Sequence, residues 1–291
     1  MAIPTQQRVG PYRLVGLIRA GHACEIWKVQ RGGSDARWAM KLLRRGAHFV
    51  RAEVALLKHE FSVGRALEHA SVIRVHDFDA TDAGAYLVMD LYPFPNLKQR
   101  INEGVVGIAP LAATIVREAA GSLDYLHQQG WIHCDVKPDN FLVSDEGHVK
   151  LIDFSLAQRR KGKLGRLFSG RMKVQGTKSY MSPEQIRGQS VDERSDVYCF
   201  GCVLHEIATG KVPFTGVSAN DLLTKHLKSK PGSITAISPD VDPAFAQLVG
   251  RMMAKDPERR PGTMQAFLEE LGSSPIFRRR PAPPEVPTDR S

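Results

Sequence analysis

The ten residues 131–140, WIHCDVKPDN, constrain the fold and the chemistry of this chain more than any other stretch. Upstream of them, apolar residues recur at helical spacing over 111–126, and Gly130 follows where the end of a helix favours glycine. Downstream, two apolar runs at 141–143 and 148–152 flank the letters SDEG and predict a hairpin. The sequence therefore predicts a polar loop between a buried helix and a strand pair, a place where catalytic groups tend to lie.

The polar residues of this loop suit the transfer of a phosphoryl group to a hydroxyl. Asp135 can accept the proton of the hydroxyl, and Lys137 can neutralise charge on the transferring group. Asn140 offers a neutral oxygen that suits Mg²⁺, and Asp153 at the end of the hairpin offers a carboxylate. These residues alone leave open the alternative of a polar surface loop without a catalytic role.

The loop resembles the catalytic loop of eukaryotic-type protein kinases, the family that includes the bacterial Hanks-type serine/threonine kinases. The roles given above to Asp135, Lys137, Asn140 and Asp153 are those that this resemblance implies. The segment WAMKL (38–42) resembles the kinase strand that carries a phosphate-binding lysine, so the resemblance gives this role to Lys41. Of three acids that follow, the family spacing counted back from His69 selects Glu60 as the partner of Lys41. We expect an ion pair between these two side chains.

The segment IDFS (152–155) resembles the DFG motif of kinases, with Ser155 in the place of glycine. The resemblance implies that Asp153 binds Mg²⁺ and that Phe154 packs beneath it. A serine has less φ freedom than a glycine, so we expect Ser155 to restrain Phe154 from switching between packing states.

The segment GTKSYMSPE (176–184) resembles the end of a kinase activation segment. The resemblance implies that Thr177 forms a hydrogen bond near Asp135 and helps to form the floor for a substrate hydroxyl. It also implies that Glu184 pairs with Arg260 of the motif DPERRP. Asp196, in the motif SDVYCFG, is likewise expected to brace the catalytic loop.

Two segments depart from the family pattern. The loop IRAGHACEI keeps Gly21 of three expected glycines, and Arg19 and Cys24 hold the other two positions, so we expect weaker or differently shaped nucleotide binding. Cys134 replaces the arginine that grips a phosphate on the activation segment. Capture of a phosphate by the cations of 159–178, activity without a phosphate and regulation by a partner all stay open.

The resemblance covers residues 10–272 and implies an α+β, bilobal kinase fold. It implies an N-lobe over 10–89 with a five-stranded sheet and one helix, a hinge over 90–95 and a mostly helical C-lobe over 96–272. Residues 273–291 are rich in proline and arginine with little to bury, which predicts a disordered tail. Strands are predicted at 12–18, 24–30, 36–43, 72–78 and 86–90, and further helices at 50–67, 197–208, 219–227, 243–254 and 264–271.

The implied activity is that of a serine/threonine protein kinase, because the pair Lys137-Pro138 after Asp135 resembles the serine/threonine kinases of the family. Such an enzyme transfers the γ-phosphoryl group of ATP to Ser or Thr hydroxyls of proteins and uses Mg²⁺. The catalytic residues implied are Asp135, Lys137, Lys41 and Glu60. The ATP-binding residues implied are Ile18, Gly21, Ile26, Ala39, Lys41, Met89, Asp90, Tyr92, Asn140 and Asp153, of which Asn140 and Asp153 are also the metal ligands.

Two other functions are weighed against this one. A pseudokinase would keep the fold as a nucleotide-binding or partner-binding scaffold, and the altered glycine loop, Cys134 and Ser155 favour it. A phosphotransferase for small molecules is disfavoured by the segment 176–184, because a small acceptor has no use for a peptide-docking floor.

Composition bounds the remaining classes. Much of the basic excess behind the net charge of +9 falls at 159–178 and 278–280, and the only aromatic residues near the longer stretch are Phe168 and Tyr180. Nucleic acid is therefore not an expected partner, whereas an acidic or phosphorylated partner stays open. No apolar run reaches the roughly 18 residues of a membrane span, and the N-terminus lacks the pattern of a secretory signal. We therefore expect a cytoplasmic protein with reduced cysteines. Cys199 and Cys202 lack a second pair for zinc and are expected to be buried thiols.

Overall fold

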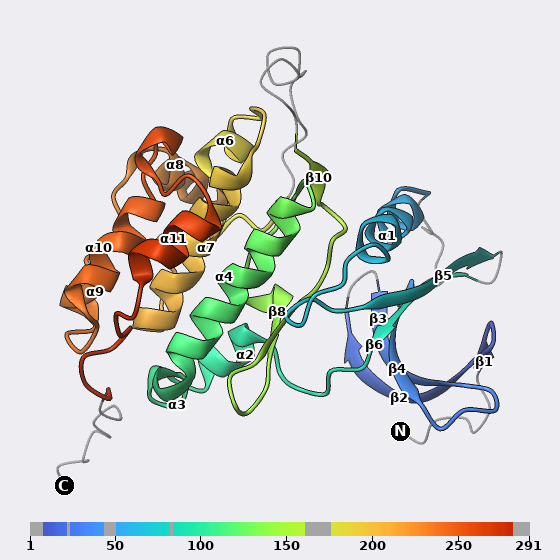
Figure 1. The fold of residues 1–291 in the computed structure, drawn as a ribbon. Coiled ribbons are helices and arrows are strands. Elements are labelled where there is room, and N and C mark those ends of the chain that lie inside the picture. Colours follow the sequence, from blue (N-terminus) through green and yellow to red (C-terminus); the bar gives the residue numbers. More distant parts are fainter. Residues whose placement is uncertain (1–7, 22–23, 44–50, 82–83, 161–175, 282–291) are drawn as a thin grey trace, which may run out of the picture. The chain divides into compact units, whose positions relative to one another are not determined.

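The computed structural model describes residues 8–21, 24–43, 51–81, 84–160 and 176–281 (Figure 1). The chain divides into two compact units. The first consists of Met1–Phe94 with Lys150–Ala157, and the second of Pro95–Val149 with Gln158–Ser291. The first is built on a sheet with one helix and the second is mostly helical, so the predicted α+β class with two lobes is confirmed.

The sheet of the first unit is curled and antiparallel, with the strand order β1-β2-β3-β4-β6-β5 (Figure 1). Its strands are β1 (Arg8–Val9), β2 (Tyr12–Ala20), β3 (Cys24–Arg31), β4 (Arg37–Leu43), β5 (Val75–Thr81) and β6 (Gly84–Asp90). The prediction of five strands was wrong by one, because β1 has two residues and is too short to show alternation of apolar and polar positions.

A core of buried residues covers one face of this sheet. Its members are Tyr12, Leu14, Val29, Met40, Tyr86 and Val88. The ring of Tyr12 meets Tyr86 edge-on at a centroid distance of 5.9 Å and Trp38 at 6.3 Å, geometries that aromatic pairs favour. Helix α1 (Arg51–Gly64) packs against β5 and β6, where Phe61 stacks on Phe78 at 5.7 Å.

Helix α1 ends at Gly64, earlier than the predicted end at residue 67, and this glycine is needed for packing. A Cβ atom at position 64 would lie 2.5 Å from Cγ2 of Val75 and 3.3 Å from the ring of Phe154. Helix propensity alone would favour alanine here by about 1 kcal/mol. The close approach of β5 explains why the chain keeps a glycine.

We expect Gly64→Ala to lower the free energy of unfolding by about 1–3 kcal/mol, because the clash outweighs the gain in helix propensity. Urea unfolding followed by circular dichroism measures it. Gly121→Ala, inside a helix where a Cβ atom would meet nothing within 4 Å, is the control and should stabilise by about 0.5–1 kcal/mol. Stabilisation by Gly64→Ala would contradict the packing argument.

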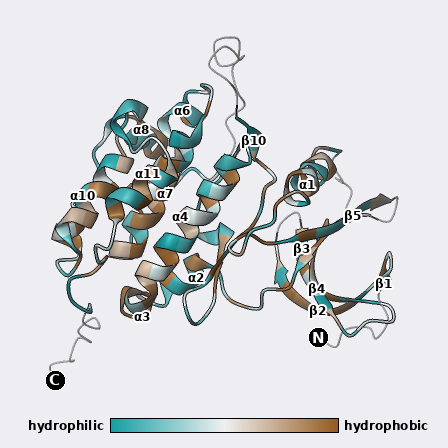
Figure 2. Cartoon of the chain, viewed as in Figure 1, coloured by the Kyte–Doolittle hydropathy of each residue, from teal (hydrophilic) through white to brown (hydrophobic). Residues whose placement is uncertain are grey.

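The second unit is built around two long helices, α4 (Ala112–Gln128) and α7 (Glu193–Thr209), which contact each other. Helix α11 (Met264–Leu271) packs on α4 and α10 (Pro243–Met252) packs on α7. Figure 2 shows hydrophobic and hydrophilic segments alternating along α4, as expected of a helix with one buried face. The shorter helices are α2 (Leu97–Asn102), α3 (Val105–Ile108), α6 (Pro183–Ile186), α8 (Ala219–Lys228) and α9 (Ile234–Ile237).

Helix α9 and the start of the tail differ from the prediction. The predicted helices did not include α9, because its four residues are too few to show periodicity. The tail was predicted to be disordered from residue 273, yet Ile276 is 3% exposed and its carbonyl accepts from Asp242 N at 2.9 Å. Arg278 N donates to Asp240 O at 2.7 Å. Residues 282–291 of the tail lie outside the described residues.

Among the described residues, Val105–Gln128 is one helical stretch whose length of 24 residues and mean hydropathy of 1.2 would suffice to cross a membrane. The stretch includes α3 and α4. Ile115, Ala119 and Leu123 on α4 are buried inside the second unit.

Candidate active site

Three charged side chains that the sequence assigned to nucleotide and metal binding lie together in the first unit. Lys41 comes from β4, Glu60 from α1, and Asp153 from the segment after the short strand β9 (Val149–Leu151). The ammonium nitrogen of Lys41 lies 2.8 Å from a carboxylate oxygen of Glu60 and 3.4 Å from one of Asp153. The predicted Lys41–Glu60 ion pair is therefore present.

Burial and charge act in opposite directions on this group. Burial lowers the pKa of Lys41, but the carboxylates of Glu60 and Asp153 outweigh it, so the pKa is raised and Lys41 stays an ammonium. Burial also raises the pKa of Glu60, and the charge of Lys41 opposes that rise. With both carboxylates ionised, the group carries one negative charge in excess.

Asp153 is held in an unusual backbone conformation. Its φ of 65° is in the left-handed region, unusual for a residue other than glycine. The hydroxyl of Ser155 donates to a carboxylate oxygen of Asp153 at 2.6 Å, a contact that glycine in the family motif could not make and that the sequence did not suggest. Phe154 is fully buried, and His59 of α1 bonds the carbonyl oxygen of Ala157 at 2.7 Å. The segment is thus tied to the helix that carries Glu60.

The residues fit a magnesium ion. The Asp153 side chain is 29% exposed and offers a hard oxygen next to an excess of negative charge. The described residues contain no cluster of three or more His, Cys, Asp or Glu side chains that could hold a metal. Mg²⁺ usually binds one or two carboxylates together with substrate phosphates and water, so it does not need such a cluster.

Gly21, the surviving glycine after β2, contacts the start of β3. Gly21 N donates to the carbonyl oxygen of Cys24 at 2.9 Å, and a Cβ atom at Gly21 would lie 2.9 Å from that same oxygen. Position 21 therefore requires glycine. Ile18 on β2 is 51% exposed, and Ile26 on β3 pairs with Lys41 of β4.

The remaining predicted ATP-binding residues lie on β4, β6 and the segment after β6. Ala39 is buried and pairs with Met89. The N–H group of Asp90 donates to Arg74 O at 2.9 Å, so this group is not free to bind adenine. Tyr92 packs its ring against Phe94 at a centroid distance of 4.9 Å.

Two of the predicted catalytic residues, Asp135 and Lys137, lie together in the second unit, between β7 (Trp131–Ile132) and β8 (Phe141–Val143). Lys137 Nζ lies 2.5 Å from a carboxylate oxygen of Asp135 and donates to the hydroxyl of Thr177 at 3.0 Å. Thr177 N donates to the other Asp135 oxygen at 3.0 Å, so the predicted contact between these residues is present. Two charged groups and one hydroxyl thus form a compact set.

Asn140 lies at the end of a 3₁₀ turn, η2 (Pro138–Asn140), and is 3% exposed. Its side-chain nitrogen donates to the carbonyl oxygen of Asp135 at 2.8 Å. The amide group is thereby oriented, and its remaining polar atom is an oxygen of the kind that Mg²⁺ binds.

A buried aspartate on α7 supports this loop. Asp196 is fully buried and accepts hydrogen bonds from His133 N at 2.7 Å and Cys134 N at 3.0 Å. A ring nitrogen of His127 on α4 lies 2.8 Å from the same carboxylate. Cys134 has a φ of 66°, again in the left-handed region. The brace that the sequence predicted at Asp196 is present.

The long-range pair Glu184–Arg260 is also present. Arg260 Nη1 and Nη2 donate to the two carboxylate oxygens of Glu184 at 2.7 and 3.0 Å. The arginine side chain is fully buried, and its Nε donates to Ala254 O at 2.8 Å. The pair joins the start of α6 to the turn before α11.

The cysteines behave as buried thiols. Cys134, Cys199 and Cys202 are at most 4% exposed, and burial raises the pKa of each thiol. Cys24 is half-buried.

Most of the basic stretch lies outside the described residues, which end at residue 160 and resume at 176. At its described start, the guanidinium of Arg159 lies 4.2 Å from the centre of the Trp131 ring. Arg160 forms an ion pair with Glu193 at 2.5 Å.

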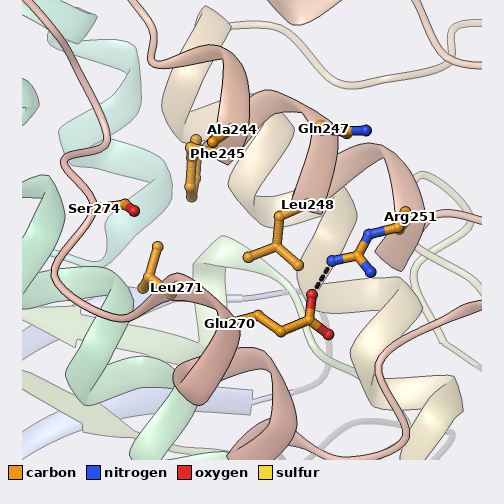
Figure 3. A pocket seen from close by; sticks show the side chains of 8 residues that line it. All are labelled: Ala244, Phe245, Gln247, Leu248, Arg251, Glu270, Leu271 and Ser274. Atoms are coloured by element: carbon orange, nitrogen blue, oxygen red, sulfur yellow. Dashed lines mark hydrogen bonds and ion pairs between the residues drawn. The ribbon is translucent and has the colours of Figure 1, made fainter.

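A pocket of about 370 Å³ lies in the second unit between α10 and α11 (Figure 3). Its lining includes Phe245, Leu248 and Leu271, and an ion pair between Arg251 and Glu270 lies beside them. None of the predicted catalytic or ATP-binding residues lines this pocket, so it is separate from the chemistry described above.

Comparison with known proteins identifies the family. Residues 12–271 match the model of the protein kinase domain. The chain is 32% identical over 283 residues to the serine/threonine-protein kinase pkn3 of Myxococcus xanthus, covering 92% of this chain and 51% of that protein. It is 32% identical over 254 residues to PknH of Mycobacterium bovis, a serine/threonine-protein kinase, covering 86% of this chain and 42% of that protein. It is 30% identical over 270 residues to a probable serine/threonine-protein kinase PknB of Lactococcus lactis, covering 92% of this chain and 43% of that protein.

The chain thus spans about half the length, or less, of the relatives it matches. The family model covers most of the two units and includes every residue that the sequence assigned to catalysis or to ATP and metal binding. This chain belongs to the protein kinase domain family.

Proposed function

We propose that this chain is a serine/threonine protein kinase that transfers the γ-phosphoryl group of ATP to Ser or Thr hydroxyls of proteins. One observation carries the proposal. Each unit holds its set of polar groups in contact: Lys41 with Glu60 and Asp153 in the first, and Asp135 with Lys137 and Thr177 in the second. Relatives that share 30–32% identity are named serine/threonine-protein kinases.

Lys41, Asp153 and Asn140 act on the nucleotide and its metal ion. Lys41 is fixed by Glu60 and binds the α- and β-phosphates of ATP as an ammonium, a state that its raised pKa secures. Asp153 and Asn140 would hold Mg²⁺, with the Ser155 hydroxyl orienting the Asp153 carboxylate. When bound, the metal supplies positive charge that neutralises the phosphate oxygens.

The residues of the second unit act on the acceptor hydroxyl. Asp135 accepts a hydrogen bond from the acceptor hydroxyl, orients the hydroxyl oxygen and takes the hydroxyl proton. Lys137 lies beside the same carboxylate and stabilises the negative charge of the transferring group. Thr177 bonds both Asp135 and Lys137 and thereby links the segment that resembles a peptide-docking floor to the catalytic pair.

The two alternatives are less well supported. A pseudokinase has no need to retain charged side chains in these contacts, and here Lys41, Glu60 and Asp153 keep them. A small-molecule phosphotransferase has no need for Thr177 to contact the catalytic aspartate.

Incorporation of labelled phosphate tests the proposal. The purified protein is incubated with γ-labelled ATP, Mg²⁺ and a protein acceptor, and mass spectrometry identifies the modified residues. We expect transfer to Ser or Thr that stops on chelation of Mg²⁺ and is absent from the Asp153→Ala protein. Equal labelling by that variant would reject the proposal, and transfer only to small alcohols would favour the small-molecule enzyme.

A further inference from the structure

Gln185 is a buried residue to which no sequence motif gave a role, and it contacts the loop that carries Asp135. It is the third residue of α6 and is 9% exposed. Its side-chain nitrogen Nε2 donates a hydrogen bond of 2.7 Å to the carbonyl oxygen of Cys134. A short buried bond of this kind joins two segments that are 51 residues apart in the chain.

The other end of the Gln185 amide is also held. Its oxygen Oε1 accepts from the backbone N–H of Ser182 at 3.0 Å and from the Ser182 hydroxyl at 2.9 Å, which completes the capping box of α6. The thiol of Cys199 on α7 lies 3.5 Å from the same oxygen. With its oxygen turned toward these donors, the amide must direct its nitrogen at the carbonyl of Cys134.

The carbonyl that Gln185 binds belongs to the peptide bond between Cys134 and Asp135. The N–H at the other side of this bond, that of Asp135, donates to Nδ1 of His133 at 3.3 Å. Asp196 holds the preceding N–H, that of Cys134. The left-handed φ of Cys134 is a strained conformation, and such conformations persist where the surroundings fix them on several sides. Gln185 supplies the contact on the carbonyl side.

We propose that Gln185 is a positioning residue for Asp135. By fixing the carbonyl of Cys134, its amide sets the rotation of the peptide bond from which Asp135 projects, and this rotation aims the carboxylate at the acceptor hydroxyl. The inference rests on the proposed function. Gln185 itself touches no reacting atom.

Gln185→Glu separates the two roles of this side chain. A glutamate keeps the oxygen that accepts from Ser182 and serves equally well in a capping box. Its ionised carboxylate has no hydrogen to give to the Cys134 carbonyl. We expect kcat to fall roughly 10- to 100-fold, the range associated with misplacement of a catalytic group. The KM for ATP should stay within about twofold, because the nucleotide contacts are unchanged.

The pH profile distinguishes positioning from general damage. When the introduced carboxyl group is protonated, it carries an O–H that can donate to the Cys134 carbonyl. Burial raises the pKa of the introduced group, as it raises the pKa of the thiols of Cys134 and Cys199, the two cysteines that this side chain contacts. The kcat of the variant relative to the wild type should therefore recover as the pH falls from about 8 to about 6.

Two further proteins complete the experiment. Gln185→Met matches the size of glutamine but cannot donate at any pH, so its kcat should be low without recovery in acid, and it serves if the glutamate variant does not fold. Gln99→Glu makes the same change in the capping box of α2, where Gln99 accepts from Asn96 N at 2.9 Å, and should keep kcat within about twofold.

The outcomes separate this inference from the function on which it rests. If the wild type and Gln99→Glu transfer phosphate while both folded Gln185 variants match them at every pH, the inference is wrong and the function stands. If the wild type transfers none, both fail together.

Discussion

An Asp135→Asn protein is expected to bind ATP as the wild type does and to turn over about 10²–10⁴-fold more slowly. In the wild type, Thr177 N donates to the Asp135 carboxylate at 3.0 Å, and asparagine keeps an oxygen that can accept this bond. Asparagine cannot take a proton from the acceptor hydroxyl. It also removes the negative charge 2.5 Å from Lys137. Steady-state kinetics at saturating ATP measures kcat, and calorimetry measures nucleotide affinity.

Asp145→Asn is the matched control for this variant. Asp145 lies in the same unit, its side chain is 72% exposed, and its partner is Arg100. The same loss of charge at this site should leave kcat within about twofold, because the interaction of an exposed pair is weak and distant from the chemistry. An Asp135→Asn protein that kept most of its turnover would remove Asp135 from the mechanism.

Arg260→Ala is expected to cost about 3–5 kcal/mol of unfolding free energy, which is a large part of the roughly 5–15 kcal/mol of a typical domain. The truncation leaves the carboxylate of Glu184 buried without its bidentate partner. It also leaves the carbonyls of Ala254 and Arg194 without the donors that Arg260 supplies at 2.8 and 2.7 Å. Urea unfolding followed by tryptophan fluorescence measures the loss.

Two comparisons test the cause of this loss. Glu184→Gln in the Arg260→Ala background should recover part of the stability, because it removes the unpaired charge, and the two changes should not be additive. Arg251→Ala breaks an exposed pair with Glu270 and should cost about 0–1 kcal/mol. A loss of similar size for Arg251→Ala and Arg260→Ala would mean that burial of the pair has no energetic consequence.

The contacts that the sequence predicted are those carried by motifs with fixed spacing. Lys41–Glu60, Asp135–Thr177 and Glu184–Arg260 each join segments that separate motifs had already marked, and each is present. The long helix α4 and most strands followed from apolar periodicity, as at Ile115, Ala119 and Leu123, which recur at helical spacing and are buried.

The contacts that the sequence did not predict depend on packing between segments that show no local pattern. The hydroxyl of Ser155 donates a hydrogen bond to Asp153. The family motif has glycine at this position, so the motif could not predict the bond. The burial of Ile276 depends on pairing with the turn before α10. Gln185 could have been noticed from the letters SPEQ, which fit a capping box, but its bond to Cys134 depends on the tertiary fold.

The left-handed backbone at Cys134 and Asp153 has a consequence for how such a chain can evolve. Each residue adjoins a functional group, and each conformation would be less strained in a glycine. Selection for heat resistance alone would accept glycine at both positions, since it would relieve the strain. Selection for turnover would resist the change, because glycine at 134 would free the backbone that directs Asp135, and glycine at 153 would remove the carboxylate itself. At these two sites, selection for stability and selection for turnover therefore favour different residues.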